Sequence, residues 1–286
     1  MGTPAGQAAG REFTPPERVP WSELGPEFTE IWGHDDKGRL KGEHFEICGQ
    51  NGSGKTYFEC TILQQRAARW DSAEIVIVTK PDDDSIGLLG WPVVDNLADL
   101  RRYRQVIFWP QTGLLGEDRE KYHEKLLYEL LTSIWHKDAN VVIAFDEVGY
   151  VENLSRRMKR LIAMYWREAR ALKISIVAMK QRPVWVLRDQ HSESHWKAVF
   201  PPADRGDSRR FAELLGEPSE WMPVLDSLDR ELHEFILYSN VRQVHYITWV
   251  DEELRPLPGQ SAERQQRQDK AQPYGQQAPK RRGKDA

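Results

Sequence analysis

Residues 49–56 read Gly-Gln-Asn-Gly-Ser-Gly-Lys-Thr and match the Walker A pattern G-x-x-x-x-G-K-[ST]. In this pattern the glycines let the backbone curl so that several N–H groups point at one phosphate chain, Lys55 supplies a mobile cation, and Thr56 supplies a hydroxyl for Mg²⁺. The segment before the loop reads as a strand and Tyr57–Trp70 reads as a helix, whose N-terminus faces the same anion. The predicted nucleotide-binding residues are Gly49, Gln50, Asn51, Gly52, Ser53, Gly54, Lys55 and Thr56.

An apolar strand, Val141–Phe145, ends on two acidic residues, Asp146 and Glu147. A buried strand that stops on a carboxylate places it at the carboxyl edge of an open α/β sheet, where ligands bind. There Asp146 is expected to hold Mg²⁺ through a water molecule, and Glu147 to orient and deprotonate the attacking water. The alternative for Glu147 is a solvated residue that begins the next turn.

A glutamine follows another apolar strand, Ile174–Met179, which runs into Lys180-Gln181-Arg182-Pro183. An amide at the end of a strand beside the phosphate loop can contact the γ-phosphate or the attacking water. Because phosphoryl transfer depends mostly on positioning and charge stabilisation, Gln181 is a candidate catalytic residue together with Lys55 and Glu147. A simple turn before Pro183 explains the glutamine equally well.

Strands and helices alternate along the chain. Glu74–Thr79 and Gln105–Trp109 are further apolar runs, and helices are expected at Arg119–Lys137 and Asn153–Leu172. This alternation predicts an α/β fold with a mostly parallel central sheet covered by helices on both faces. Further strands are expected at Glu27–Trp32 and Glu43–Cys48, around a polar turn, and at Glu234–Tyr238 and Gln243–Val250, as a hairpin.

Several stretches occur in an order that is found in a known family. They are Gly49–Thr56, Val142–Glu147, Arg167–Ile174 running into Val177–Pro183, Ala198–Phe200, Asp207-Ser208 and Leu214–Gly216. Together they resemble the FtsK/HerA family of DNA-translocating ATPases, over roughly Glu43 to Gly216. The resemblance implies a RecA-like P-loop NTPase fold, a ring of six subunits, and ATP hydrolysis coupled to movement of double-stranded DNA.

The resemblance also implies roles for single residues. By motif match, Gln181 is similar to the family's γ-phosphate-sensing glutamine, and Arg170 to an arginine near the subunit interface that is a candidate finger for the neighbour's ATP. The chain departs from the family pattern at two positions. Lys180 stands where Thr or Ser is usual, and Lys173 stands where Gly is usual.

The helix expected at Asn153–Leu172 has a cationic face. Its apolar residues recur at 3.6-residue spacing, and Arg156, Arg160, Arg167 and Arg170 fall on the opposite face. A solvated surface is one explanation. The other is an interface, in which Arg170 reaches the neighbour's γ-phosphate and the remaining three arginines face DNA or a partner subunit.

The chain has 286 residues, which is long enough for one sizeable α/β core. We expect a RecA-like ATPase domain at residues 26–251, between a disordered N-terminal tail (1–25) and a disordered basic C-terminal tail (252–286). From Glu263 to Ala286 seven Lys or Arg residues stand against three acids. That tail is either simply solvated or a loose electrostatic hold on nucleic acid. The net charge of −4 argues against a protein that coats nucleic acid with its whole surface.

Nothing in the sequence predicts membrane insertion or export. No run approaches the roughly 18 apolar residues of a membrane span, and the N-terminus lacks the apolar core of a secretory signal. Two cysteines, Cys48 and Cys60, make no disulfide framework. We therefore expect a cytoplasmic protein, in the host cytoplasm if it is phage-encoded.

The leading interpretation is an ATP-driven, Mg²⁺-dependent translocase of double-stranded DNA that works as a homo-oligomer, a hexamer by the resemblance. Genome packaging in a phage or DNA transfer by a mobile element are the settings that suit such a minimal motor. The alternatives are an ATPase that powers protein export or virion assembly, a small-molecule kinase, and a nucleotide-gated adaptor without catalysis.

Overall fold

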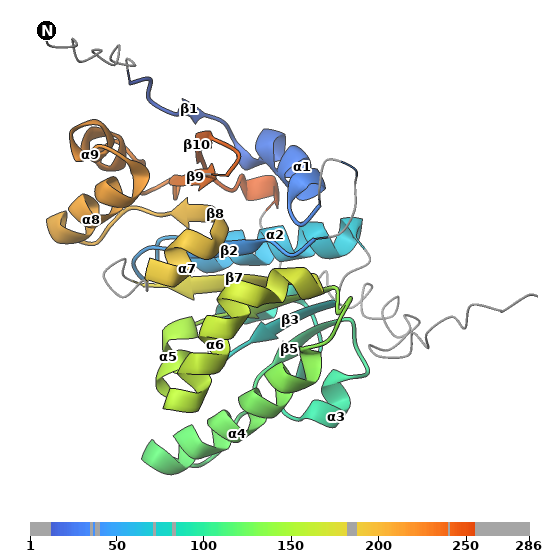
Figure 1. The fold of residues 1–286 in the computed structure, drawn as a ribbon. Coiled ribbons are helices and arrows are strands. Elements are labelled where there is room, and N and C mark those ends of the chain that lie inside the picture. Colours follow the sequence, from blue (N-terminus) through green and yellow to red (C-terminus); the bar gives the residue numbers. More distant parts are fainter. Residues whose placement is uncertain are drawn as a thin grey trace, which may run out of the picture.

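The computed structural model describes residues 13–34, 37, 41–70, 73–81, 84–181, 188–239 and 241–254. Within them one ten-stranded sheet has the order β1-β10-β9-β8-β2-β7-β6-β3-β5-β4 (Figure 1). Its strands are β1 (Glu17–Arg18), β2 (His44–Cys48), β3 (Ala73–Ile77), β4 (Val93–Val94), β5 (Gln105–Phe108), β6 (Val141–Phe145), β7 (Ile174–Lys180), β8 (Ser194–Val199), β9 (Phe235–Ser239) and β10 (Val244–Thr248).

The sheet is mostly parallel. In its spatial order the strands from β8 to β4 all run in the same direction, with β2 between β7 and β8 and with β6 between β7 and β3. Beside β8, the antiparallel strands β9 and β10 form the hairpin that the sequence predicted, and β1 pairs with β10. The expected α/β fold with a mostly parallel sheet is therefore confirmed.

Helices cover both faces of the sheet. They are α1 (Trp21–Ile31), α2 (Lys55–Arg69), α3 (Leu97–Leu100), α4 (Gly116–Ile134), α5 (Val148–Asn153), α6 (Arg156–Glu168), α7 (Arg188–Glu193), α8 (Arg205–Leu215) and α9 (Pro218–Asp226), with short 3₁₀ helices η1 (Asp84–Leu89), η2 (Ala169–Leu172) and η4 (Glu252–Leu254). None of the helices in the described part of the chain has both the length and the apolar character to span a bilayer.

Alternation along β6 shows why this sheet needs two covered faces. Val142 and Ala144 belong to the core cluster that includes Phe58 of α2, whereas Ile143 belongs to the cluster that includes Ile162 of α6. Successive side chains of a strand point to opposite faces of the sheet. The five consecutive apolar residues of β6 therefore place apolar side chains on both faces, and both faces must be covered. Figure 1 shows α4, α5 and α6 together on one face of the sheet.

The strand predicted at Glu27–Trp32 is wrong, because this segment belongs to α1. Trp21, Leu24 and Phe28 are buried, and their spacing of three and four residues is helical. Pro26 lies inside the helix, where its missing N–H removes one hydrogen bond. The prediction placed a domain boundary at this proline and therefore missed a helical pattern that begins before it.

The N-terminal tail predicted at residues 1–25 is also wrong from residue 13 onward. The N–H of Val19 donates to the carbonyl of Ile247 at 2.9 Å, which extends the pairing of β1 with β10. Trp21 is fully buried, and its ring lies edge-on to Phe58 of α2 with centroids 4.9 Å apart. Residues 1–12 and residues 255–286 of the predicted C-terminal tail lie outside the described residues.

The long helix predicted at Asn153–Leu172 is divided into α5, α6 and η2. Ser155 begins α6, because its Oγ accepts a hydrogen bond from the N–H of Met158 at 3.1 Å and donates one to Glu124 at 2.7 Å. A serine at this position satisfies an N–H that the first turn of a helix leaves without an intrahelical partner. The apolar spacing continues across the break, so periodicity alone did not reveal it.

Candidate nucleotide-binding site

The predicted phosphate loop joins the carboxyl end of β2 to the N-terminus of α2. Gly54 lies in the left-handed region (φ 95°) directly before α2, and a Cβ there would come 3.0 Å from the Cβ of His233. A Cβ on Gly49 would come 2.5 Å from the Cβ of Phe200. These two positions therefore need glycine. The loop ends directly at the N-terminus of α2, where the helix dipole favours an anion.

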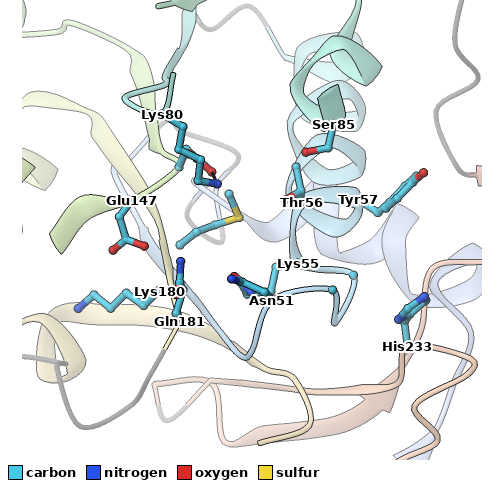
Figure 2. Close-up of a pocket in the computed structure, with 14 residues that line it drawn as sticks. Asn51, Lys55, Thr56, Tyr57, Lys80, Ser85, Glu147, Lys180, Gln181 and His233 are labelled. Atoms are coloured by element: carbon cyan, nitrogen blue, oxygen red, sulfur yellow. Dashed lines mark hydrogen bonds and ion pairs between the residues drawn. The ribbon is translucent and has the colours of Figure 1, made fainter. Parts of the chain in front are cut away.

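Strand order brings the other predicted residues to this loop. Because β2 lies beside β7, and β7 beside β6, the residues that follow their carboxyl ends meet at one edge of the sheet. One pocket of about 480 Å³ at this edge is lined by Lys55, Thr56, Asp146, Glu147 and Gln181. Figure 2 shows Glu147 and Gln181 on one side of the pocket and Tyr57 and His233 on the other. The pocket is further lined by Asn51, Gly52, Gly54, Lys80, Ser85, Met179 and Lys180.

The two acids after β6 have different environments. The side chain of Asp146 is fully buried, and its Oδ1 accepts a hydrogen bond from Nζ of Lys80 at 2.9 Å. Glu147 is partly exposed. Burial, followed by the negative charge of Asp146, raises the pKa of Glu147 above its ordinary value, and Lys80 and Lys180 oppose the rise. A raised carboxyl pKa suits a group that must accept a proton.

The side chain of Lys55 folds back onto the phosphate loop. Its Nζ donates to the carbonyl of Gln50 at 2.6 Å, and burial is the largest effect that lowers the pKa of its ammonium group. The same pocket holds the hydroxyl residue Thr56 and the carboxylate of Asp146, the kinds of oxygen ligand that Mg²⁺ takes alongside substrate phosphates. The ammonium of Lys80 already shows that a cation fits against Asp146. The residues present therefore fit a magnesium ion held by Thr56 and Asp146.

The two departures from the family pattern have local explanations. Lys180 ends β7 with its Nζ 3.8 Å from Oε1 of the buried Glu46 on β2, so it supplies a counter-charge within the sheet. Lys173 lies in the left-handed region (φ 63°) between η2 and β7, where glycine would adopt the same conformation without strain. Its Nζ forms an ion pair with Asp138 at 2.8 Å.

At the end of the pocket away from Glu147, aromatic residues adjoin the phosphate loop. A cavity of about 200 Å³ is lined by Gly54, Tyr57, Phe200, His233, Phe235 and Val250. The rings of Phe200 and Phe235 are stacked with centroids 4.5 Å apart. His233 has a left-handed backbone (φ 57°) and lies against Gly54. No sequence pattern pointed to His233, which lies far along the chain from the loop.

Lys80 is a second site residue that sequence reasoning missed. It lies three residues beyond the end of β3, whereas Asp146 directly follows β6, and these two strands are neighbours in register. The apolar run before Lys80 indicated a buried strand that ends near this edge, but a lysine shortly after a strand has no established pattern to match.

The predicted arginines lie away from the pocket. Nε of Arg170 donates to the carbonyl of Gly42 at 3.4 Å, at the amino edge of the sheet. Strand β7, which runs for seven residues from Ile174 to Lys180, lies between Arg170 and the pocket and is about 20 Å long. Arg170 therefore does not reach this pocket. Arg156, Arg160 and Arg167 are exposed along α6.

Comparisons with known proteins identify the fold. No protein-family profile matches the sequence, and no curated protein does. The DNA-packaging ATPase B204 from Sulfolobus turreted icosahedral virus is similar in structure, with a TM-score of 0.56 and 15% identity over 73% of this chain and 98% of that chain.

Two further solved structures share the fold. EssC (ATPases 2 and 3) from Geobacillus thermodenitrificans has a TM-score of 0.53 and 13% identity, over 81% of this chain and 45% of that chain. The pCW3 conjugation coupling protein TcpA has a TM-score of 0.50 and 13% identity, over 87% of this chain and 75% of that chain. These similarities confirm the expected RecA-like P-loop NTPase fold.

Proposed function

We propose that this protein is an ATPase that moves double-stranded DNA and works as a ring of subunits, six by the family resemblance. The observation that carries the ATPase part is the pocket in which Lys55, Thr56, Asp146, Glu147 and Gln181 meet. A catalytic carboxylate beside the metal-binding one supports hydrolysis over transfer of the phosphoryl group to another substrate.

The proposed reaction is attack of water on the γ-phosphate of ATP. Glu147 accepts a proton from the water, the new P–O bond forms as the bond to the β-phosphate oxygen breaks, and ADP and phosphate leave. Lys55 offsets negative charge on the β- and γ-phosphates, and Gln181 contacts the γ-phosphate or the water. Magnesium at Thr56 and Asp146 would supply further charge stabilisation when bound.

The pocket also supports an orientation for the nucleotide. With the γ-phosphate at Glu147, the base lies toward Tyr57 and His233, where the aromatic cavity adjoins the loop. Aromatic stacking on a base is worth about 1–3 kcal/mol. The His233→Ala variant is therefore expected to weaken ATP binding by about fivefold or more and to leave the binding of inorganic triphosphate unchanged.

Calorimetric titration of ATP and of inorganic triphosphate checks this orientation. The exposed His136→Ala variant is the control and should bind both ligands as the wild type does. If His233→Ala loses affinity for ATP and for inorganic triphosphate equally, His233 supports the phosphate loop and does not contact the base.

DNA movement is supported by the family resemblance and by the exposed cationic face of α6. Duplex DNA is expected to raise the rate of ATP hydrolysis by the purified protein. A flat response favours an ATPase that drives protein export or virion assembly. A phosphorylated small product in place of free phosphate favours a kinase. No turnover under any condition favours the adaptor.

Charge reversal tests whether α6 contacts DNA. The double variant Arg156→Glu/Arg160→Glu is expected to weaken duplex binding. The slope of log binding constant against log salt concentration should also become less steep, by about one unit for each phosphate that the helix no longer neutralises. Fluorescence anisotropy over a salt series measures both. A double variant on α8, Arg209→Glu/Arg210→Glu, changes the charge by the same amount and is the control. Equal weakening in both variants would point to a general charge effect.

A further inference from the structure

Lys80 stands beside the metal-binding carboxylate as a second cation of the phosphate pocket. Ile77 at the end of β3 is in register with Phe145 at the end of β6, and the N–H of Asp146 donates to the carbonyl of Ile77 at 3.1 Å. This pairing brings the two strand ends together. Nζ of Lys80 then lies 2.9 Å from Oδ1 of Asp146.

The main chain at Lys80 is held in place, while its side chain extends into the pocket. Nε1 of Trp109 donates to the carbonyl of Lys80 at 2.8 Å, and Nη2 of Arg119 donates to the carbonyl of Thr79 at 2.6 Å. The side chain of Lys80 is 40% exposed, whereas that of Asp146 is 0% exposed. A lysine has a flexible four-carbon stem, so its ammonium can change partners without a shift of the backbone.

The motif lysine has a different partner. Lys55 donates to the carbonyl of Gln50, and Lys80 forms the ion pair with Asp146. Figure 2 shows Lys80 on the same side of the pocket as Glu147, across from His233. That is the end at which the terminal phosphate lies if Glu147 activates the water. Lys80 is therefore within the part of the pocket that distinguishes a triphosphate from a diphosphate.

A buried carboxylate that loses its counter-cation is strongly destabilised. A metal ion held at Asp146 would compete with the ammonium of Lys80, because both cations are attracted to the same carboxylate. With that ion bound, Lys80 would no longer have to neutralise Asp146. The nearest new negative charge is then the terminal phosphate of the nucleotide.

We propose that Lys80 is a second phosphate-binding lysine, which pairs with Asp146 before nucleotide binds and turns to the terminal phosphate in the nucleotide complex. The inference rests on the proposed ATPase function of the same pocket. It makes Lys80 a residue that selects ATP over ADP, because only the triphosphate offers a group at that end.

Calorimetric titration of Mg²⁺ with a non-hydrolysable ATP analogue and of Mg²⁺ with ADP tests the inference. The Lys80→Met variant keeps the length of the side chain and removes its charge. It is expected to bind the ATP analogue about tenfold more weakly and ADP nearly as well as the wild type, and retained ADP binding shows that the pocket is folded. The Lys80→Arg variant keeps the charge and should retain most of the preference. Lys125→Met, on the exposed side of α4, should change neither affinity.

The outcomes separate the two proposals. Suppose that the wild type binds both nucleotides, and that Lys80→Met loses affinity for both equally or for neither. The inference about Lys80 is then wrong and the ATPase proposal stands. If the wild type binds neither nucleotide, the ATPase proposal fails and the inference fails with it.

Discussion

The Glu147→Gln variant is expected to hydrolyse ATP about 10²–10⁴-fold more slowly than the wild type, with ATP binding nearly unchanged. Glutamine has almost the same shape as glutamate but cannot accept the proton of the attacking water. Glu147 lines the pocket beside Asp146 and lies on the side opposite His233. Steady-state phosphate release measures the loss, and calorimetric titration with ATP measures binding.

The pH dependence of turnover adds a second measurement on the same residue. Only the ionised carboxylate can act as the base, and burial together with the charge of Asp146 raises the pKa of Glu147 above its ordinary value. Turnover is therefore expected to fall as the pH drops through this raised pKa, and to recover above it. The control is Glu129→Gln on the exposed side of α4, which should behave as the wild type. Full activity in Glu147→Gln would assign water activation to another group.

The Arg170→Ala variant is expected to lose about 10³-fold or more of its hydrolysis and to keep its affinity for ATP. In the structure Arg170 lies beside Gly42 at the amino edge of the sheet, a full strand length from the pocket at the carboxyl edge. An arginine in that position can act on ATP only if it acts on the ATP of a neighbouring subunit. Loss of activity with binding retained is the result that this arrangement predicts.

Mixing two inactive variants tests the subunit arrangement directly. Arg170→Ala subunits keep an intact pocket, and Glu147→Gln subunits keep an intact Arg170. In a mixed ring a neighbour of the second kind completes the pocket of the first, so hydrolysis is expected to return in part. If Arg170 acts within its own subunit, or only supports the fold, the mixture stays inactive. A mass measurement with ATP bound establishes whether a ring forms.

Much of the site was predictable because its residues follow buried strands. The run Val141–Phe145 has five apolar residues and then Asp146, so strand type and position in the sheet follow from a short local pattern. The same argument placed Gln181 after β7, in the pocket where the structure has it. Arg182 and Pro183 lie outside the described residues. Local patterns of this kind are informative because a parallel strand needs both faces covered.

Other features depended on contacts that a local pattern does not contain. His233 reaches the phosphate loop only because β9 follows it in the sheet beside β8, and nothing near it in the sequence indicates that contact. The segment from residue 13 was included in the predicted tail because residues 1–25 are rich in Gly, Pro and Ala and show little periodicity. Its order comes from pairing with β10 and from the burial of Trp21 against α2. The break before α6 was missed because one serine competes with a continuous apolar spacing.

Strand β7 connects the two ends of the proposed machinery. Its seven residues are all buried, and it is hydrogen-bonded to β2 on one side and to β6 on the other. A strand held along both edges cannot bend independently of its neighbours, so Arg170 before it and Gln181 after it are kept about one strand length apart. In the proposed ring, each β7 would then be a rigid link between the pocket of its own subunit and Arg170, which acts on the ATP of the neighbouring subunit. The strand would therefore set the distance between the ATP that a subunit binds and the ATP on which its Arg170 acts.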